Sequence, residues 1–175
     1  MNNIYISDFL SYLEVEANYS KNTINSYEND LNKFEEYYKS KDLLKITSKD
    51  IEKYIQTLSD LAPTTVSHNI SSLKTFYSYF LKQGRISNNP TDGIKSPKLG
   101  IHLPTYLTID EVNKLLDIEV TDAFSSRNKA ILELMYATGL RISEVISLEF
   151  KNIDYDECII RVMGKGSKER IVPVN

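Results

Sequence analysis

The chain of 175 residues contains one cysteine, no tryptophan and only two histidines. A lone cysteine, Cys158, excludes an internal disulfide and a cysteine-based zinc site. The hydrophobic content of 41% and the charged content of 26% exclude a fibrous chain and disorder throughout. The length allows one ordinary globular domain or two small ones.

Long hydrophobic runs are also missing. The apolar stretch at residues 130–137 is far shorter than the roughly 18 residues that a membrane span needs, and Glu133 interrupts it. The opening residues MNNIY lack the charged and apolar regions of a signal peptide. We therefore expect a soluble, cytoplasmic protein without a membrane partner.

Acidic and basic residues are concentrated in different segments of the chain. A net charge of −3 and a pI near 5.5 argue at first against a nucleic-acid partner. By segment, however, the net charge is −4 over residues 1–60, +4 over 61–104, −6 over 105–157 and +3 over 158–175. The two basic segments predict a surface that faces phosphates, with an ordinary solvated face as the alternative.

Amphipathic periodicity predicts four helices in a first domain, residues 1–84. The apolar positions that repeat at helical spacing are Ile4, Ile6, Phe9, Leu10 and Leu13, then Ile24, Tyr27, Leu31, Phe34 and Tyr38, then Ile51, Tyr54, Ile55 and Leu58, and last Val66, Ile70, Leu73, Phe76, Tyr77 and Phe80. Ser20 and the pair Thr47 and Asp50 predict helix starts, Pro63 suits a first turn, and Gly84 predicts an end.

Residues 85–104 break every regular period and predict an extended, positive linker that carries Lys95 and Lys98. A second domain, residues 105–175, begins with a capping box at Thr108 and Glu111.

Two further helices are expected in the second domain, one from about Ser126 to Thr138 that Gly139 stops, and one through Val145 and Leu148. The β-branched stretches at 159–162 and 171–174, joined by GKGSK, predict a β-hairpin. Because the sequence ends inside the second strand, we expect a fragment.

Two short motifs carry candidate chemistry. Arg141 follows a helix-ending glycine and precedes the carboxylate of Glu144 by three residues, so the arginine can present a fixed fork to a phosphate. Lys165 sits at a glycine-flanked hairpin tip, where an ammonium can reach a phosphate or a leaving oxygen. The ordinary alternatives are a helix-terminal ion pair for Arg141 and a solvated turn lysine for Lys165.

The strings ATGLRISEV at 137–145 and GKGSKER at 164–170 resemble the tyrosine recombinase (phage integrase-like) family, most closely its Xer type. The likeness covers essentially the whole chain, because SKNTINSY at 20–27 and residues 70–99 resemble the opening helices, the last core-binding helix and the linker of that family. It implies a mainly α fold with a small β-hairpin: a four-helix, SAM-like core-binding domain, then the first part of an α+β catalytic domain.

The resemblance also implies roles for three residues. Arg141 matches the first catalytic arginine, which contacts the scissile phosphate, and Glu144 matches the acidic residue that supports it. Lys165 matches the hairpin lysine that protonates the leaving 5′ oxygen. The implied reaction is attack by a tyrosine on a phosphodiester to form a 3′-phosphotyrosyl link, and it requires no metal and no cofactor.

The family's remaining catalytic histidines, its second arginine and its tyrosine nucleophile lie downstream of the hairpin. His68 and His102 do not fit the family's His-x-x-Arg pattern, and all 12 tyrosines precede the hairpin, most at packing positions. We therefore expect a chain that binds DNA but has no nucleophile and is inactive alone.

The implied partners are a double-stranded DNA recombination site and other recombinase protomers, which form a tetrameric synapse in the family. The implied role is chromosome-dimer resolution or integration. Two other functions stay open, a DNA-binding adaptor without chemistry and a helical protein-interaction module. The basic side chains predicted to contact DNA are Lys74, Lys82, Lys95, Lys98, Lys168 and Arg170.

Overall fold

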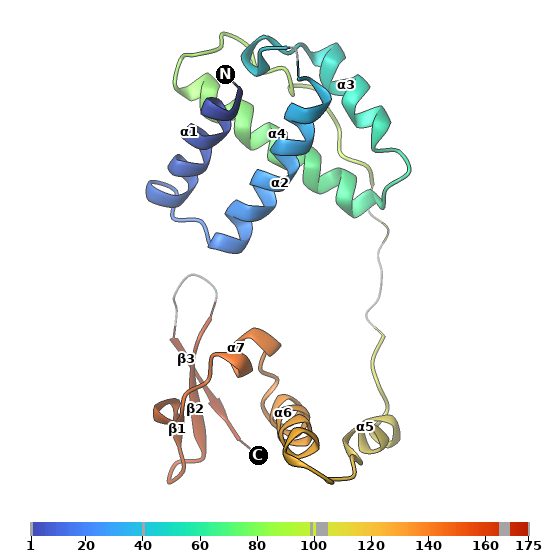
Figure 1. Cartoon of the computed structure of the whole chain (residues 1–175), viewed down its shortest axis with the longest axis vertical. Helices are drawn as coiled ribbons and strands as arrows, with labels where there is room; N and C mark the ends of the chain where they lie inside the picture. The colour runs from blue at the N-terminus through green and yellow to red at the C-terminus, as the bar shows by residue number, and fades with distance from the viewer. Residues whose placement is uncertain (1, 40, 99, 101–104, 165–168, 175) are drawn as a thin grey trace. The chain divides into compact units, whose positions relative to one another are not determined.

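The computed structural model describes residues 2–39, 41–98, 100, 105–164 and 169–174. The chain divides into two compact units, Met1–His102 and Leu103–Asn175 (Figure 1). The described residues are mostly helical, with a small antiparallel sheet in the second unit, which confirms the expected fold class.

The helices of the first unit follow the sequence pattern closely. Their bounds are α1 Asn2–Val15, α2 Lys21–Tyr37, α3 Ser48–Thr57 and α4 Pro63–Lys82, with a short 3-10 helix η1 at Leu43–Lys45. Ser20 caps α2, and Thr47 with Asp50 forms the expected capping box at the start of α3. Pro63 occupies the first turn of α4, where its missing N–H costs no hydrogen bond.

Aromatic packing on α4 holds the first unit together. Phe76, Tyr77 and Phe80 are fully buried, and they meet Phe9 of α1 and Phe34 of α2 in one core. The rings of Phe9 and Phe76 pack edge to face, with centroids 5.4 Å apart. Since large aromatic side chains remove the most apolar area from water, this core is the main source of stability for the unit.

The first part of the predicted linker packs on the helical unit. Asn89, Pro90 and Thr91 are buried, and Ile86 and Ile94 contact the aromatic core. The Asn89 side-chain oxygen accepts hydrogen bonds from both the backbone N–H and the hydroxyl of Thr91. This turn satisfies its own polar groups, so it can be buried at little cost.

The second unit combines short helices with a sheet. The elements are α5 Ile109–Leu116, α6 Ala123–Thr138, α7 Ile142–Ile146, the 3-10 helix η2 Phe150–Asn152, β1 Ile153–Asp154, β2 Ile159–Met163 and β3 Glu169–Pro173. Within the described residues the strand order is β1-β2-β3, all antiparallel. In the β2–β3 register, Val162 lies opposite Arg170. The hairpin expected from the β-branched stretches is confirmed.

Two expectations for this unit were wrong in detail, and one element was not predicted. Helix α6 begins at Ala123 rather than near Ser126, because Asp122 caps it and accepts a hydrogen bond from the Ser125 backbone N–H. Helix α7 ends at Ile146, so Leu148 lies beyond it. The short strand β1 was not predicted, since two residues carry no periodicity. The stop at Gly139 is confirmed, with a φ of 63° that favours glycine.

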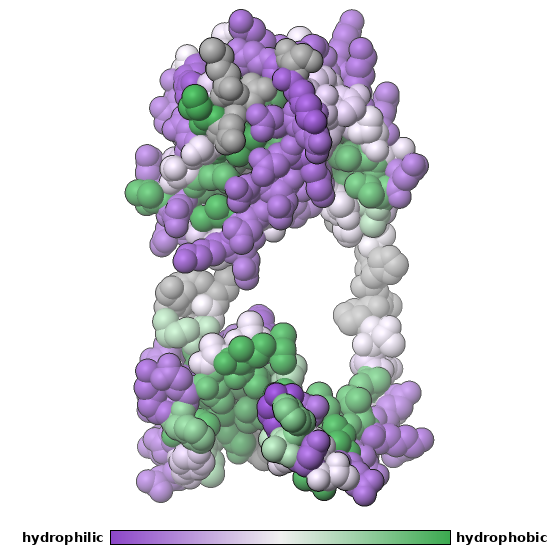
Figure 2. Space-filling model, viewed as in Figure 1, coloured by the Kyte–Doolittle hydropathy of each residue, from purple (hydrophilic) through white to green (hydrophobic). Residues whose placement is uncertain are grey.

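The second unit has a small core and much exposed apolar surface. Its buried hydrophobic cluster consists of Leu140, Ile160 and Val162. Figure 2 shows hydrophobic residues over much of the visible surface of this unit. The large apolar side chains with the highest exposure in the unit include Tyr106, Ile109, Ile146 and Phe150. In the described parts of the chain, no helix is both long enough and apolar enough to cross a membrane.

A matched pair of tyrosines tests how polar groups contribute to the first core. The buried Tyr77 hydroxyl donates a 2.9 Å hydrogen bond to the Leu43 carbonyl, whereas the buried Tyr54 hydroxyl has no partner among the described residues. We expect Tyr77→Phe to lower the free energy of unfolding by about 0.5–1.5 kcal/mol and Tyr54→Phe to leave it unchanged or raise it. Urea titrations of both variants measure this, and equal losses would contradict the assignment.

Candidate active site

Arg141 stands at the start of α7, directly after the turn that ends α6. The positive φ of Gly139 reverses the chain there, and the buried side chain of Leu140 fixes the turn in the core of the second unit. The Arg141 side chain is 69% exposed. The backbone therefore holds this arginine firmly while its guanidinium faces outward.

Glu144 supports Arg141 through both of its carboxylate oxygens. Oε2 accepts a 2.8 Å hydrogen bond from the Arg141 backbone N–H, and Oε1 lies 3.1 Å from Nη1 of the Arg141 guanidinium. The Glu144 side chain is only 8% exposed. The expected pairing of Arg141 with Glu144 is thus present, and it fixes the backbone as well as the side chain.

Arg170 of β3 is a second partner of the same carboxylate. Its Nη1 lies 2.6 Å from Oε1 of Glu144 and its Nη2 lies 2.8 Å from Oε2, a two-pronged geometry. This contact was not predicted from the sequence, because the two residues are 26 positions apart and no local spacing indicates it. The register of β2 and β3 places Arg170 against α7.

These contacts set the charge state of Glu144. The hydrogen bonds from Arg170 and then from the Arg141 backbone lower the pKa of Glu144 to about 2, although burial acts in the opposite direction. The carboxylate is therefore ionised over the whole physiological range. With one anion between two guanidinium groups, the cluster keeps a net positive charge.

The cluster can bind a phosphate on its open side. Glu144 engages Nη1 of Arg141, which leaves other N–H donors of the exposed guanidinium for an anion. A guanidinium fork fits the paired oxygens of a phosphate group, and the fixed backbone lowers the cost of orienting it. Arg170, whose side chain is 36% exposed, is committed to Glu144.

The other predicted site residues are scattered. Lys165 and Lys168 lie outside the described residues. Lys82, Lys95 and Lys98 are exposed, and Lys74 is partly buried on α4. Among the described residues, no group of histidine, cysteine and acidic side chains could hold a metal ion. Of the tyrosines, Tyr54 and Tyr77 belong to the first core and Tyr27 packs against it, as predicted.

Two family models match the chain in order. The N-terminal SAM-like domain of phage integrases matches residues 6–84, and the phage integrase family itself matches residues 105–175.

Curated relatives match over nearly the whole chain. The tyrosine recombinase XerD of Oceanobacillus iheyensis is 41% identical over 175 residues, which is 97% of this chain and 59% of the relative. The tyrosine recombinase XerC of Myxococcus xanthus is 42% identical, again over 97% of this chain, and 58% of that relative is covered. The chain thus spans somewhat more than half the length of these relatives.

Solved structures show the same fold. A XerH site-specific recombinase bound to palindromic difH substrate, in a post-cleavage complex, is 26% identical with a TM-score of 0.68, covering 85% of this chain and 47% of that one. A lambda integrase tetramer bound to a Holliday junction is 17% identical with a TM-score of 0.75, covering 98% and 50%, and supports the fold alone. Because both family models match in order, the chain belongs to the phage integrase family, and it is similar along nearly its full length to tyrosine recombinases of the Xer type.

Proposed function

We propose that this chain supplies the DNA-binding unit and the first part of the catalytic unit of a site-specific recombinase, which cuts and rejoins DNA through a 3′-phosphotyrosyl intermediate. The observation that carries the proposal is the buried Glu144 carboxylate, which holds Arg170 and Arg141 while the Arg141 guanidinium stays exposed. An arginine fixed in this way suits a phosphate whose negative charge grows during the reaction.

In the proposed mechanism, different residues stabilise the negative charge that develops on different oxygens in the transition state. Arg141 contacts the non-bridging oxygens of the scissile phosphate, and Glu144 positions Arg141 without touching DNA. Lys165 gives a proton to the leaving 5′ oxygen as general acid, because an alkoxide is a poor leaving group at neutral pH. No tyrosine of this chain is assigned as the nucleophile, and the proposed chemistry needs no metal or cofactor.

The proposed partners are duplex DNA and other recombinase protomers, up to a tetramer on two sites. The XerH recombinase bound to palindromic difH substrate, which is 26% identical, supports a DNA partner by similarity. We place the protein in the cytoplasm, with chromosome-dimer resolution in chromosome partition and the cell cycle, or integration, as its role. The candidate phosphate contacts remain Lys74, Lys82, Lys95, Lys98 and Lys168. Arg170, which was also predicted to contact DNA, is instead proposed to hold Glu144, because both of its terminal nitrogens bond that carboxylate.

The two competing functions make different predictions. A DNA-binding adaptor without chemistry would bind duplex DNA equally well, but it has no use for an exposed arginine held by a buried carboxylate. A helical protein-interaction module would not bind duplex DNA at all. Binding to duplex DNA therefore distinguishes the interaction module from the recombinase and the adaptor. DNA cleavage by the longer protein distinguishes the recombinase from the adaptor.

Duplex binding by this chain should depend strongly on salt. If the protein neutralises Z phosphates, log K should fall against log[salt] with a slope of about −0.9Z, because binding releases counterions. Lys82→Ala should make the slope less steep by about one unit. Lys39→Ala is the matched control, since Lys39 is also exposed but pairs with Glu36. A flat salt response in fluorescence anisotropy would contradict the DNA-binding proposal.

Glu144 should stabilise the second unit in a pH-dependent manner. Because its pKa is lowered from 4.5 to about 2 on folding, its contribution is present above pH 4.5 and is lost as the pH falls towards 2. We expect Glu144→Gln to speed amide hydrogen exchange in residues 103–175 at pH 7, with a difference from wild type that shrinks below pH 4.5. Glu149→Gln, which alters an exposed carboxylate paired with Lys151, is the control. A difference that persists unchanged at pH 3 would refute this role.

Lys165 can be tested in the longer protein that carries the nucleophile. As general acid it should be worth about 10² to 10⁴ in rate, so Lys165→Ala should slow cleavage of a normal phosphodiester by that factor with little change in DNA affinity. A substrate with sulfur at the bridging 5′ position needs no proton on its leaving group and should restore most of the rate. Arg141→Ala should not be rescued. Equal defects of Lys165→Ala on both substrates would remove Lys165 as the acid.

A further inference from the structure

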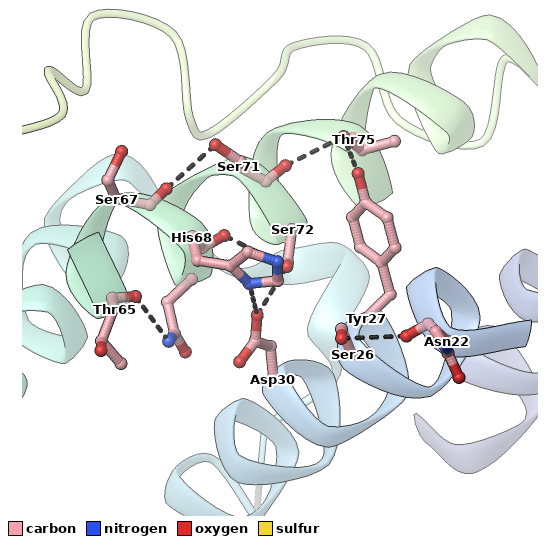
Figure 3. A network of polar contacts seen from close by, with 11 residues as sticks. Asn22, Ser26, Tyr27, Asp30, Thr65, Ser67, His68, Ser71, Ser72 and Thr75 are labelled. Atoms are coloured by element: carbon pink, nitrogen blue, oxygen red, sulfur yellow. Dashed lines mark hydrogen bonds and ion pairs between the residues drawn. The ribbon is translucent and has the colours of Figure 1, made fainter. Parts of the chain in front are cut away.

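An open hollow lies on the first unit between α2 and α4. Every side chain that lines it can form hydrogen bonds. The lining residues are Ser26, Asn29 and Asp30 from α2 and Thr64, Thr65, His68 and Asn69 from α4. Figure 3 shows the two helices side by side, with the Asp30 and His68 side chains pointing toward each other.

Asp30 is the anchor of this hollow. Its side chain is 11% exposed, and its Oδ2 lies 2.7 Å from Nδ1 of His68 and accepts a 2.7 Å hydrogen bond from the Ser72 hydroxyl. The His68 side chain is 55% exposed, and Tyr27 packs beside it with ring centroids 6.4 Å apart. One buried carboxylate oxygen therefore fixes the imidazole at a solvent-facing surface.

The contact with Asp30 also decides which ring nitrogen is free. An ionised carboxylate only accepts hydrogen bonds, so Nδ1 of His68 carries the proton that the bond requires. In the neutral imidazole the other nitrogen, Nε2, then has a lone pair and accepts. Nε2 makes no hydrogen bond to any residue in the described part of the chain. The ring is thus held with an acceptor available to a ligand.

The lining favours an uncharged, hydrogen-bonding ligand over a phosphate. Asp30 and His68 are the charged or titratable side chains among the lining residues, and no lysine or arginine is present. A phosphate would sit near the Asp30 carboxylate without a fixed cation to balance it. The edge of a DNA base is neutral and offers both donors and acceptors, which match the amides of Asn29 and Asn69 and the hydroxyls of Ser26, Thr64 and Thr65.

The surrounding charge is compatible with DNA. Helix α4 contains no acidic residue over its length, although the chain has 24 of them, and it carries Lys74 and Lys82. Basic residues on the same helix as a hollow without lysine or arginine in its lining match the usual division between phosphate contacts that position a protein and side chains that read bases.

We propose that His68 reads a base edge through Nε2, and that Asp30 is a positioning residue that holds the imidazole in its accepting form. The base should present an amino group, cytosine N4 or adenine N6, at the contacted position. This assignment rests on the proposed function, because it requires that the first unit binds duplex DNA.

Two substitutions of His68 distinguish a role in DNA contact through Nε2 from a structural role through the bond to Asp30. In His68→Asn the amide nitrogen takes the place of Nδ1, so the bond to Asp30 can persist while the outer nitrogen is lost. In His68→Gln the amide takes the place of Nε2, so an outer hydrogen-bonding group is kept. Thermal unfolding of each variant shows whether the first unit is still folded.

The experiment uses the whole chain and a library of DNA duplexes with a randomised segment. The bound fraction is sequenced, and affinities are then measured on the preferred duplex across a range of salt concentrations. We expect His68→Asn to lose the wild-type preference for cytosine or adenine at one position, with affinity for the preferred duplex about 5- to 100-fold lower and an unchanged salt slope. His68→Gln should keep part of the preference.

Asp30→Asn tests the positioning role at that same position. An amide can donate to Nδ1 as well as accept from it, so Nε2 can then carry the proton and donate. The preference should broaden to bases that present an acceptor, with no change in the salt slope. A purely structural Asp30 would alter stability and leave the base preference intact.

The outcomes separate this inference from the proposed function. If the wild-type chain binds no duplex at any salt concentration, the proposed function fails and the base-reading role fails with it. If the wild type binds but shows no base preference, or if a folded His68→Asn keeps it, only the base-reading role is wrong. A salt slope less steep by about one unit in His68→Asn would make His68 a phosphate contact and overturn the assignment.

Discussion

The carboxylate of Glu144 is the junction on which the second unit depends. It is buried, it caps the first turn of α7 through the Arg141 backbone, and it receives the Arg170 guanidinium from β3. A buried charge is tolerated only when its partners are in place, so α7 and β3 must come together for either to be stable. Among the described residues, the buried part of the hydrophobic cluster in this unit is Leu140, Ile160 and Val162, so a larger part of the stability of the unit depends on this polar contact.

The two units are stabilised by different kinds of interaction. The first is held by a dense aromatic core along α4, which includes none of the lysines proposed to contact DNA. The second is held by a charged cluster that is itself the candidate site. A change in the Glu144 contacts therefore alters structure and chemistry together, whereas the hollow at His68 can change its hydrogen-bonding pattern without loss of the core beneath it.

Much of the fold could be predicted because its signals are local. Helical periodicity, the capping boxes at Thr47 and Thr108 and the glycine at 139 each act within one or two turns, and the structure confirms them. The pairing of Arg141 with Glu144 was predictable for the same reason. The bond between Arg170 and Glu144 and the bond between Asp30 and His68 were not, because each joins residues 26 or 38 positions apart on different elements. Only the tertiary fold brings such pairs together.

The shared oxygen of Asp30 has a mechanical consequence for the first unit. Ser72 and His68 are four residues apart on α4, one helical turn, and both contact the same oxygen of a residue on α2. A shift of α4 to the next residue register, which combines a translation of about 1.5 Å with a rotation of about 100°, would break both contacts at once. The two helices are therefore locked in one register. A force applied to either helix is transmitted to the other, and the pair moves as a single rigid body.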